Sequence, residues 1–156
     1  MIAKNPFEAE EFLSQNKKVF LLALEGGWAL SNIEKAKKIL DKIPLMSVTV
    51  EHFLDLKSTV GSAAKQRGLF GFVQDLFSIV FGASEPLTGF GRDLITLLFE
   101  KRIWIDMSHS NIETKNYIIK NRPKGYPILD THTVLKKYYK TDRGIDDSIL
   151  DLVKTE

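Results

Sequence analysis

The chain has 156 residues, of which 44% are hydrophobic and 27% are charged, as is ordinary for one soluble globular domain. Its 22 basic and 20 acidic residues are well mixed and give a net charge of +2, so the charge does not favour a nucleic-acid partner. Cysteine is absent, which excludes disulfides and thiolate metal sites. Any metal must therefore be held by His, Asp or Glu.

The sequence shows neither a signal peptide nor a membrane span. Residues 1–8 contain no apolar segment of the kind that signal peptides carry. The longest apolar stretch, residues 69–83, is interrupted by Gln74 and Asp75 and is too short to cross a bilayer. We therefore expect a cytoplasmic protein with no membrane span, and a single domain over residues 1–156.

Short apolar runs alternate with amphipathic stretches, a pattern typical of βα units. Residues 18–24 are almost continuously apolar, as expected for a parallel strand covered on both faces. Ser31, with Glu34 three residues later, predicts a helix N-cap, and Pro44 ends that helix. In chain order the predicted elements are a helix at 6–15, a strand at 18–24, a helix at 31–43, a strand at 45–50, an apolar helix at 69–83, a helix at 88–101, a strand at 103–106, a helix at 111–121, a strand at 126–129, and helices at 133–139 and 146–153.

Each of the four predicted strands is followed by a residue that can bind a metal or a substrate. Glu25 follows the first strand, and His52, His109 and His132 follow the next three. The carboxyl ends of parallel strands meet at one edge of a sheet, so we expect these side chains to converge there. One glutamate and two or three histidines form a suitable ligand set for zinc.

Each of these residues also has a simpler interpretation. A single histidine at a strand end is more often a packing or hydrogen-bonding residue than a ligand. Glu25 precedes two glycines and would serve equally as a turn carboxylate, while Asp106 and Asp130 are interpreted as helix caps or as supporting hydrogen-bond groups. The convergence of all four strand ends favours a site.

Five short segments carry a family resemblance. They are LEGGWAL at 24–30, PLTGFGR at 86–92, IDMSH at 105–109, PILDTH at 127–132 and RGIDD at 143–147. They resemble the EGG, GLTxFG, vDlSH, PvixSH and RNxxD segments of the membrane (renal) dipeptidases, and they occur in the same order and at nearly the same spacing. That family belongs to the metal-dependent amidohydrolase superfamily. Each segment alone is a weak signal, whereas five in order are specific.

The resemblance implies an α/β fold, a partial TIM-barrel-like (βα) repeat of about four parallel strands from the middle of a (βα)8 metallo-dipeptidase barrel. It implies that Glu25 bridges two zinc ions and that His109 and His132 are ligands to one of them. By the same resemblance His52 polarises the substrate or stabilises the oxyanion. Arg143 falls where the family binds the substrate's carboxylate, a role that suits a guanidinium group.

The sequence also departs from the family pattern. The family holds its other zinc with an HxD motif on the first strand and moves protons with an Asp near the last strand, and this sequence contains no HxD. The SHSN pattern is altered around His132, and Gly144 replaces an asparagine. Residues 53–86 read as an apolar insertion, longer than the family counterpart. A chain of 156 residues is too short to close an eight-stranded barrel, which takes about 200 residues or more.

We therefore predict a zinc-dependent dipeptidase-like hydrolase that takes one or two zinc ions and small dipeptide substrates. Without the acid–base Asp, we expect this chain alone to have little or no activity. A fragment, one half of a split enzyme and a degenerate relative all satisfy the pattern. The alternative is a catalytically inactive binding or assembly module derived from a dipeptidase barrel. A small-molecule binder without metal would leave the histidine placement unexplained.

A partial barrel exposes sheet edges, and residues 69–81 add further apolar surface. This surface predicts a homodimer or a complementary partner chain. The alternative is that residues 69–81 cover the chain's own core.

Overall fold

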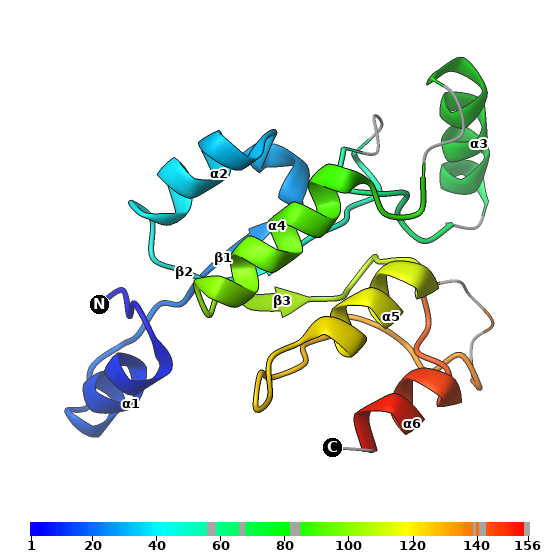
Figure 1. Ribbon diagram of the computed structural model, residues 1–156. Coiled ribbons are helices and arrows are strands. Elements are labelled where there is room, and N and C mark those ends of the chain that lie inside the picture. Colours follow the sequence, from blue (N-terminus) through cyan, green and yellow to red (C-terminus); the bar gives the residue numbers. More distant parts are fainter. Residues whose placement is uncertain (56–58, 66–67, 82–84, 139, 141–142, 155–156) are drawn as a thin grey trace.

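The computed structural model describes residues 1–55, 59–65, 68–81, 85–138, 140 and 143–154 (Figure 1). Strands and helices alternate along much of the chain, as predicted. The elements are α1 (Pro6–Ser14), β1 (Leu22–Glu25), the 3-10 helix η1 (Gly27–Leu30), α2 (Ile33–Leu40), β2 (Leu45–Thr49), α3 (Leu69–Phe81), α4 (Gly89–Glu100), β3 (Trp104–Asp106), α5 (Ile112–Asn121) and α6 (Asp147–Lys154).

A parallel sheet of three strands, in the order β1-β2-β3, occupies the centre of the described residues. Its register pairs Glu25 with Thr49 and Thr49 with Asp106. These three residues therefore form one row at the carboxyl edge of the sheet. The α/β class and the parallel strands agree with the sequence prediction.

The fourth predicted strand, 126–129, is wrong as a strand: among the described residues it forms a single parallel bridge, between Asp106 and Leu129. Pro127 has no N–H and cannot donate to a strand ladder, while the Tyr126 N–H is used in a turn to the Pro123 carbonyl. Met107 N still donates to Leu129 O at 2.9 Å. The segment thus runs beside β3, and its last residues still reach the carboxyl edge.

The hydrophobic core lies on one face of the sheet, where α2 and α4 cover it (Figure 1). Val48 and Ile105 of the sheet are buried there with Leu94 and Leu98 of α4. On β1, Ala23 and Glu25 are exposed and alternate with half-buried neighbours. The expectation that this strand is covered on both faces was therefore wrong, because the second face of β1 has no cover among the described residues.

Helix starts follow side-chain caps. Thr88 caps α4 and accepts from Gly91 N, and Asn111 caps α5 and accepts from Glu113 N and Thr114 N. The predicted cap at Ser31 was wrong. Ser31 N–H closes η1 on Trp28 O, and Asn32 Oδ1 accepts from Lys35 N at 2.9 Å instead.

The helix predicted at 133–139 is absent from its described residues, 133–138. Leu135 instead bridges Ile145 in parallel, because Lys136 N donates to Ile145 O and Ile145 N donates to Val134 O. These pairings use the backbone groups that a helix would need. Tyr139 lies outside the described residues.

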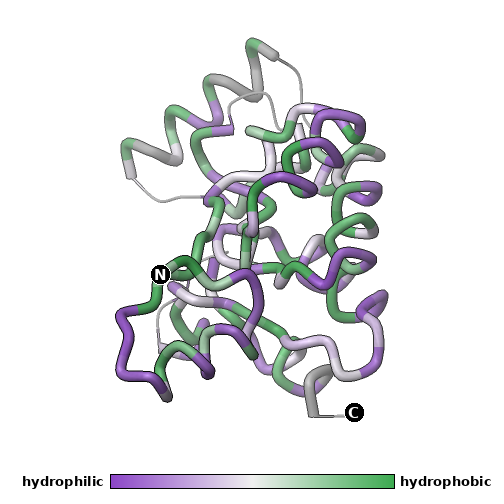
Figure 2. Tube along the Cα trace, turned by 90° about the vertical axis from the view of Figure 1, so that its left-hand side faces the viewer, coloured by the Kyte–Doolittle hydropathy of each residue, from purple (hydrophilic) through white to green (hydrophobic). Residues whose placement is uncertain are grey.

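Helix α3 confirms the predicted apolar helix and stands apart from the sheet (Figure 1), and Figure 2 shows the hydropathy along the chain from the side. Four of its apolar side chains, spaced along one face, are exposed: Leu69, Phe72, Leu76 and Val80. No helix among the described residues is long and apolar enough to span a bilayer. These elements do not test the single domain with an insertion at 53–86, which stays a prediction.

Candidate functional site

Glu25 is placed by a tight turn at the end of β1. Gly26 has φ 112° and Gly26 N donates to Thr49 O, so the turn requires a residue that tolerates positive φ. A Cβ atom on Gly27 would approach Val50 O to 2.7 Å. The two glycines therefore press the turn against β2, and the Glu25 side chain remains 53% exposed at the sheet edge.

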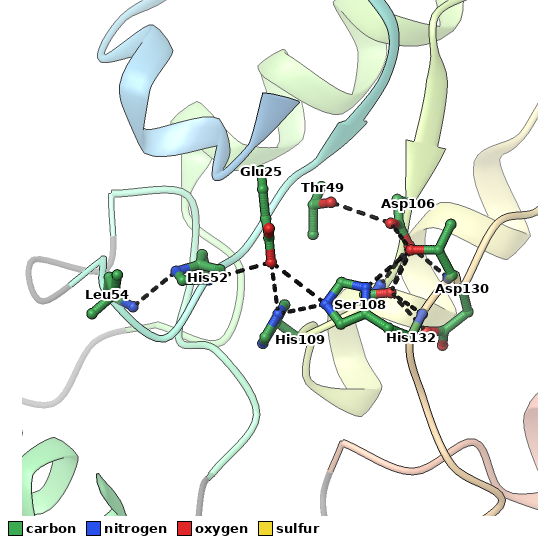
Figure 3. Close-up of polar contacts among 10 residues, drawn as sticks. Glu25, Thr49, His52, Leu54, Asp106, Ser108, His109, Asp130 and His132 are labelled. Carbon is green, nitrogen blue, oxygen red and sulfur yellow. Dashed lines mark hydrogen bonds and ion pairs between the residues drawn. The ribbon is translucent and has the colours of Figure 1, made fainter. Parts of the chain in front are cut away.

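Four of the five predicted site residues lie together, because three histidines converge on the Glu25 carboxylate (Figure 3). Glu25 Oε1 lies 3.1 Å from His109 Nε2, 3.4 Å from His52 Nε2 and 3.5 Å from His132 Nε2. His109 Nε2 and His132 Nε2 are 2.8 Å apart. Three imidazole nitrogens and a carboxylate oxygen thus surround one small space.

These separations suit a shared cation. Two ligands on a tetrahedral zinc with bonds of about 2.0–2.1 Å lie about 3.3 Å apart. The Glu25–His109 and Glu25–His132 distances bracket that value, and a small outward movement of His132 from His109 would complete the set. The donors are also the nitrogen and oxygen types that zinc prefers.

Hydrogen bonds on its far side prepare His132 to be a ligand. Thr131 Oγ1 donates to Asp106 Oδ2 at 2.5 Å, so it accepts from His132 Nδ1, 3.0 Å away. The proton then sits on Nδ1 and the Nε2 lone pair faces Glu25. Such carboxylate-supported histidines are typical of metal sites.

His52 has the opposite arrangement. Its Nδ1 accepts from Leu54 N at 3.2 Å, which puts the proton of the neutral ring on Nε2, facing Glu25. Glu25, His52 and His109 by themselves offer ligand atoms within 4.8 Å of one another. The tautomer nevertheless favours His132 over His52 as a ligand and makes His52 a hydrogen-bond donor.

His109 is buried and neutral over the ordinary pH range. Burial lowers the pKa of His109 to about 4, and the charges of Arg143, His52 and His132 act in the same direction. Its backbone has φ 66°, an uncommon conformation for a residue other than glycine and one that clusters at functional sites. The contacts of Nε2 with Glu25 and with the His132 lone pair put its proton on Nε2, but Nδ1 has no hydrogen-bond partner among the described residues, so the proton can move there when Nε2 binds a cation.

The side chain of Arg143, the fifth predicted residue, lies near enough to His109 for its charge to lower the pKa of that histidine. The Arg143 carbonyl accepts from Lys115 Nζ at 3.1 Å and from Thr133 Oγ1 at 2.8 Å. These bonds hold the backbone of Arg143 beside the segment that carries His132.

Asp106, which the sequence had singled out, accepts hydrogen bonds from three residues that it had not: Thr49, Ser108 and Thr131. Asp106 accepts from Thr49 Oγ1, from the N–H and hydroxyl of Thr131, and from the N–H and hydroxyl of Ser108. Burial opposes ionisation, but these hydrogen bonds prevail and hold the pKa of Asp106 below its usual value. These hydrogen bonds, with the one between Ser108 Oγ and Asp130 Oδ1, agree with the supporting role predicted for Asp106 and Asp130. The position of Thr131 directly before His132 was the feature of the sequence that could have predicted its contact with that histidine.

A second missed residue, Glu51, precedes His52 and is almost fully buried. It accepts from Asn111 N at 3.1 Å and from Thr114 Oγ1 at 2.7 Å, and so ties the end of β2 to the first turn of α5. Burial raises the pKa of Glu51 to about 8. In the sequence, a charged residue directly after a predicted strand does not indicate burial. The burial of Glu51 depends on the packing of α5, which is distant in the chain.

Neither a family model nor a curated protein sequence matches the chain. Solved structures do. An amidohydrolase from Pseudomonas aeruginosa matches with a TM-score of 0.75 at 16% identity over 99% of this chain and 42% of that one. The probable dipeptidase PvdM from the same organism matches with a TM-score of 0.75 at 14% identity, over 99% and 36% of the two chains.

A third match is a metallo peptidase from Rhodobacter sphaeroides, liganded with a phosphinate mimic of the dipeptide L-Ala-D-Ala. Its TM-score is 0.69 at 15% identity, over 99% of this chain and 40% of that one. The chain therefore spans about two fifths of the length of these structures. At these identities the likeness shows the fold alone: the chain shares the fold of the matching part of these amidohydrolase and dipeptidase structures.

Proposed function

We propose that the chain carries the metal-binding and substrate-carboxylate-binding residues of a zinc-dependent dipeptidase-like hydrolase. The observation that supports this most directly is the convergence of Glu25, His109 and His132, with His132 presenting its Nε2 lone pair to the others. Three protein ligands leave a coordination position open, as in catalytic zinc sites. Bound zinc would supply a water of lowered pKa and polarise the scissile carbonyl.

The chain's own residues would bind and orient the substrate. His52 Nε2–H faces the same space and can donate to a carbonyl or oxyanion of the substrate. Arg143 would bind the C-terminal carboxylate of a dipeptide with its guanidinium fork. Glu25 and His132 are half exposed, so the site is open to solvent and ligand on their side.

The experiment that tests this proposal measures zinc content by elemental analysis after purification without chelator. We expect zinc in the wild-type protein, with micromolar affinity, since a site that lacks supporting groups binds more weakly. His109→Ala and His132→Ala should lose the zinc. His52→Ala should retain it, because its proton faces the site.

Two carboxylate variants complete the design. Glu25→Gln should lose zinc, while Glu34→Gln, which changes an exposed carboxylate on α2, should not. Equally low zinc in the wild type and in all variants would contradict the proposal and leave the histidines with a structural role.

A second candidate function is that of an inactive binding or assembly module. It is favoured by the hydrogen bonds and the ion pair that already occupy the carboxylates near the site. Asp106 is saturated with hydrogen bonds, and Asp130 is buried in an ion pair with Lys115. Neither is placed to move protons for a substrate. A folded protein that binds no zinc would support this candidate.

A further inference from the structure

His132 and Arg143 lie on a segment with little regular structure. Within the described part of residues 129–146, backbone pairing is limited to two single bridges, Asp106–Leu129 and Leu135–Ile145. A ligand on such a segment keeps its place only if side chains anchor it.

Lys115 provides such an anchor from α5. Its side chain is 1% exposed, and Nζ lies 2.8 Å from Asp130 Oδ2, whose side chain is 4% exposed. The same Nζ donates to Arg143 O at 3.1 Å. One ammonium group, with three N–H donors, therefore holds the segment both just before His132 and at Arg143.

The anchor continues to His132 through Ser108. Asp130 Oδ1 lies 3.1 Å from Ser108 Oγ, which also accepts the His132 N–H at 3.2 Å (Figure 3). Helix α5 is a firm base for this arrangement, because Ile118 and Ile119 are in the core and Asn111 Nδ2 donates to Ser62 O and Pro86 O.

Burial of a lone ammonium group is strongly unfavourable, and a buried ion pair is seldom better for stability than apolar residues of the same size. An apolar side chain at position 115 would fill this space equally well, but it could not reach a carboxylate and a carbonyl at once. The geometry therefore points to Lys115 as a positioning residue that holds His132 and Arg143 in register within one site. This inference rests on the function proposed above.

The test compares the zinc affinity and the thermal stability of Lys115→Met with those of the wild type. We expect the zinc affinity to fall by about 10–100-fold, the range for the loss of a group that supports a ligand. The matched control is Lys120→Met, which removes an exposed lysine from the same helix and should change neither quantity.

The double variant Lys115→Met/Asp130→Asn separates positioning from charge compensation. It leaves no unpaired buried charge, so its thermal stability should recover relative to Lys115→Met, while its zinc affinity stays at least about tenfold below wild type. Recovery of zinc affinity together with stability would overturn the inference. So would a Lys115→Met protein whose affinity is within about twofold of wild type.

A second readout does not need zinc. The 15N chemical shifts of the His132 ring report its tautomer, and Lys115→Met should shift them while leaving those of His52, which is set by Leu54, unchanged. If the wild type binds no zinc, the proposed function fails, yet this measurement still decides the positioning role: unchanged His132 signals would overturn it.

Discussion

At the scale of single residues, the hydrogen bonds made by the Nδ1 atoms of His132 and His52 give the two histidines different roles. The Thr131 hydroxyl is committed to Asp106 and so holds a proton on His132 Nδ1, whereas Leu54 N–H leaves the proton of His52 on Nε2. One ring therefore offers a lone pair to the site and the other offers a proton.

The first prediction concerns Thr131. Thr131→Val keeps the shape of the side chain but removes the hydroxyl that orients His132, and we expect zinc affinity to fall by about 10–100-fold. Thr131→Ser keeps the hydroxyl and should stay near the wild-type value. Competition with a chromophoric chelator measures both. Equal affinities for Val and Ser would mean that the hydroxyl does not set the tautomer.

The second prediction concerns the pH dependence of stability at Glu51. Burial raises its folded pKa to about 8, against 4.5 in the unfolded chain; the Asp55 charge adds to this effect, and hydrogen bonds from Thr114, Asn111 and Ser110 oppose it. Between these values the folded state keeps a proton that the unfolded state loses. The contribution of Glu51 is therefore full below pH 4.5 and is lost as the pH rises to about 8.

Glu51→Gln has no such titration. From pH 6.5 to 7.5 we expect the free energy of unfolding of the wild type to fall, relative to this variant, by about 1 kcal/mol, close to the limit for one proton. Urea denaturation at each pH measures it. The lowered pKa of His109 acts in the opposite direction, and its window, from about 4 to 6.5, ends where this range begins. A constant difference between the two proteins would show that Glu51 is ionised when folded.

At the scale of elements, α3 is an apolar helix that leaves several of its apolar side chains exposed. Its exposed face carries Leu69, Phe72, Leu76 and Val80, and monomers seldom leave contiguous apolar patches of more than a few hundred Å² in water. The homodimer or partner chain expected from the sequence remains a prediction. The alternative, that this helix covers the chain's own core, does not account for these four side chains.

The third prediction tests this surface by light scattering at micromolar concentration. We expect wild-type association, and Phe72→Glu should yield folded monomers, because the burial of apolar area at about 25 cal/mol per Å² drives such contacts. Phe7→Glu, which changes an exposed aromatic residue on α1, is the control and should leave association unchanged. A clean wild-type monomer would rule out self-association and leave a partner chain to be found.

At the scale of the whole molecule, helices cover one face of the sheet, and the candidate site lies at the carboxyl edge of the sheet. Its carboxyl edge collects Glu25, Thr49 and Asp106 in one row, and the loops after the strands bring the three histidines to it. The solved structures of the same fold are more than twice as long as the part that this chain matches.

The fourth prediction is that this chain alone shows little or no dipeptidase activity, even with added zinc. An absent acid–base group costs typically 10²–10⁴-fold, and Asp130 is held by Lys115 rather than free to replace it. Hydrolysis of a simple dipeptide, followed by ninhydrin or chromatography, measures this. Turnover at about 10 per second, an ordinary enzyme value, would show that a residue of this chain performs the proton transfer.

The sequence by itself determined the fold class and which side chains would lie together at the carboxyl edge of the sheet. Apolar runs and amphipathic stretches marked the strands and helices, and the carboxyl ends of parallel strands must share an edge, so Glu25, His52, His109 and His132 had to converge. Local rules failed where longer-range pairing competed with them, as in residues 133–138, whose backbone groups pair with Ile145.

Only the tertiary structure decided what surrounds these residues. Burial of Lys115 and Glu51 depends on how α5 packs against the sheet, and no pattern within α5 distinguishes a lysine that points inward to a carboxylate from one that points to water. The histidine tautomers likewise depend on partners that come from neighbouring loops and strands. Which residues follow the strands is thus a local property of the sequence, whereas the positions and protons of their side chains are set by contacts between distant segments.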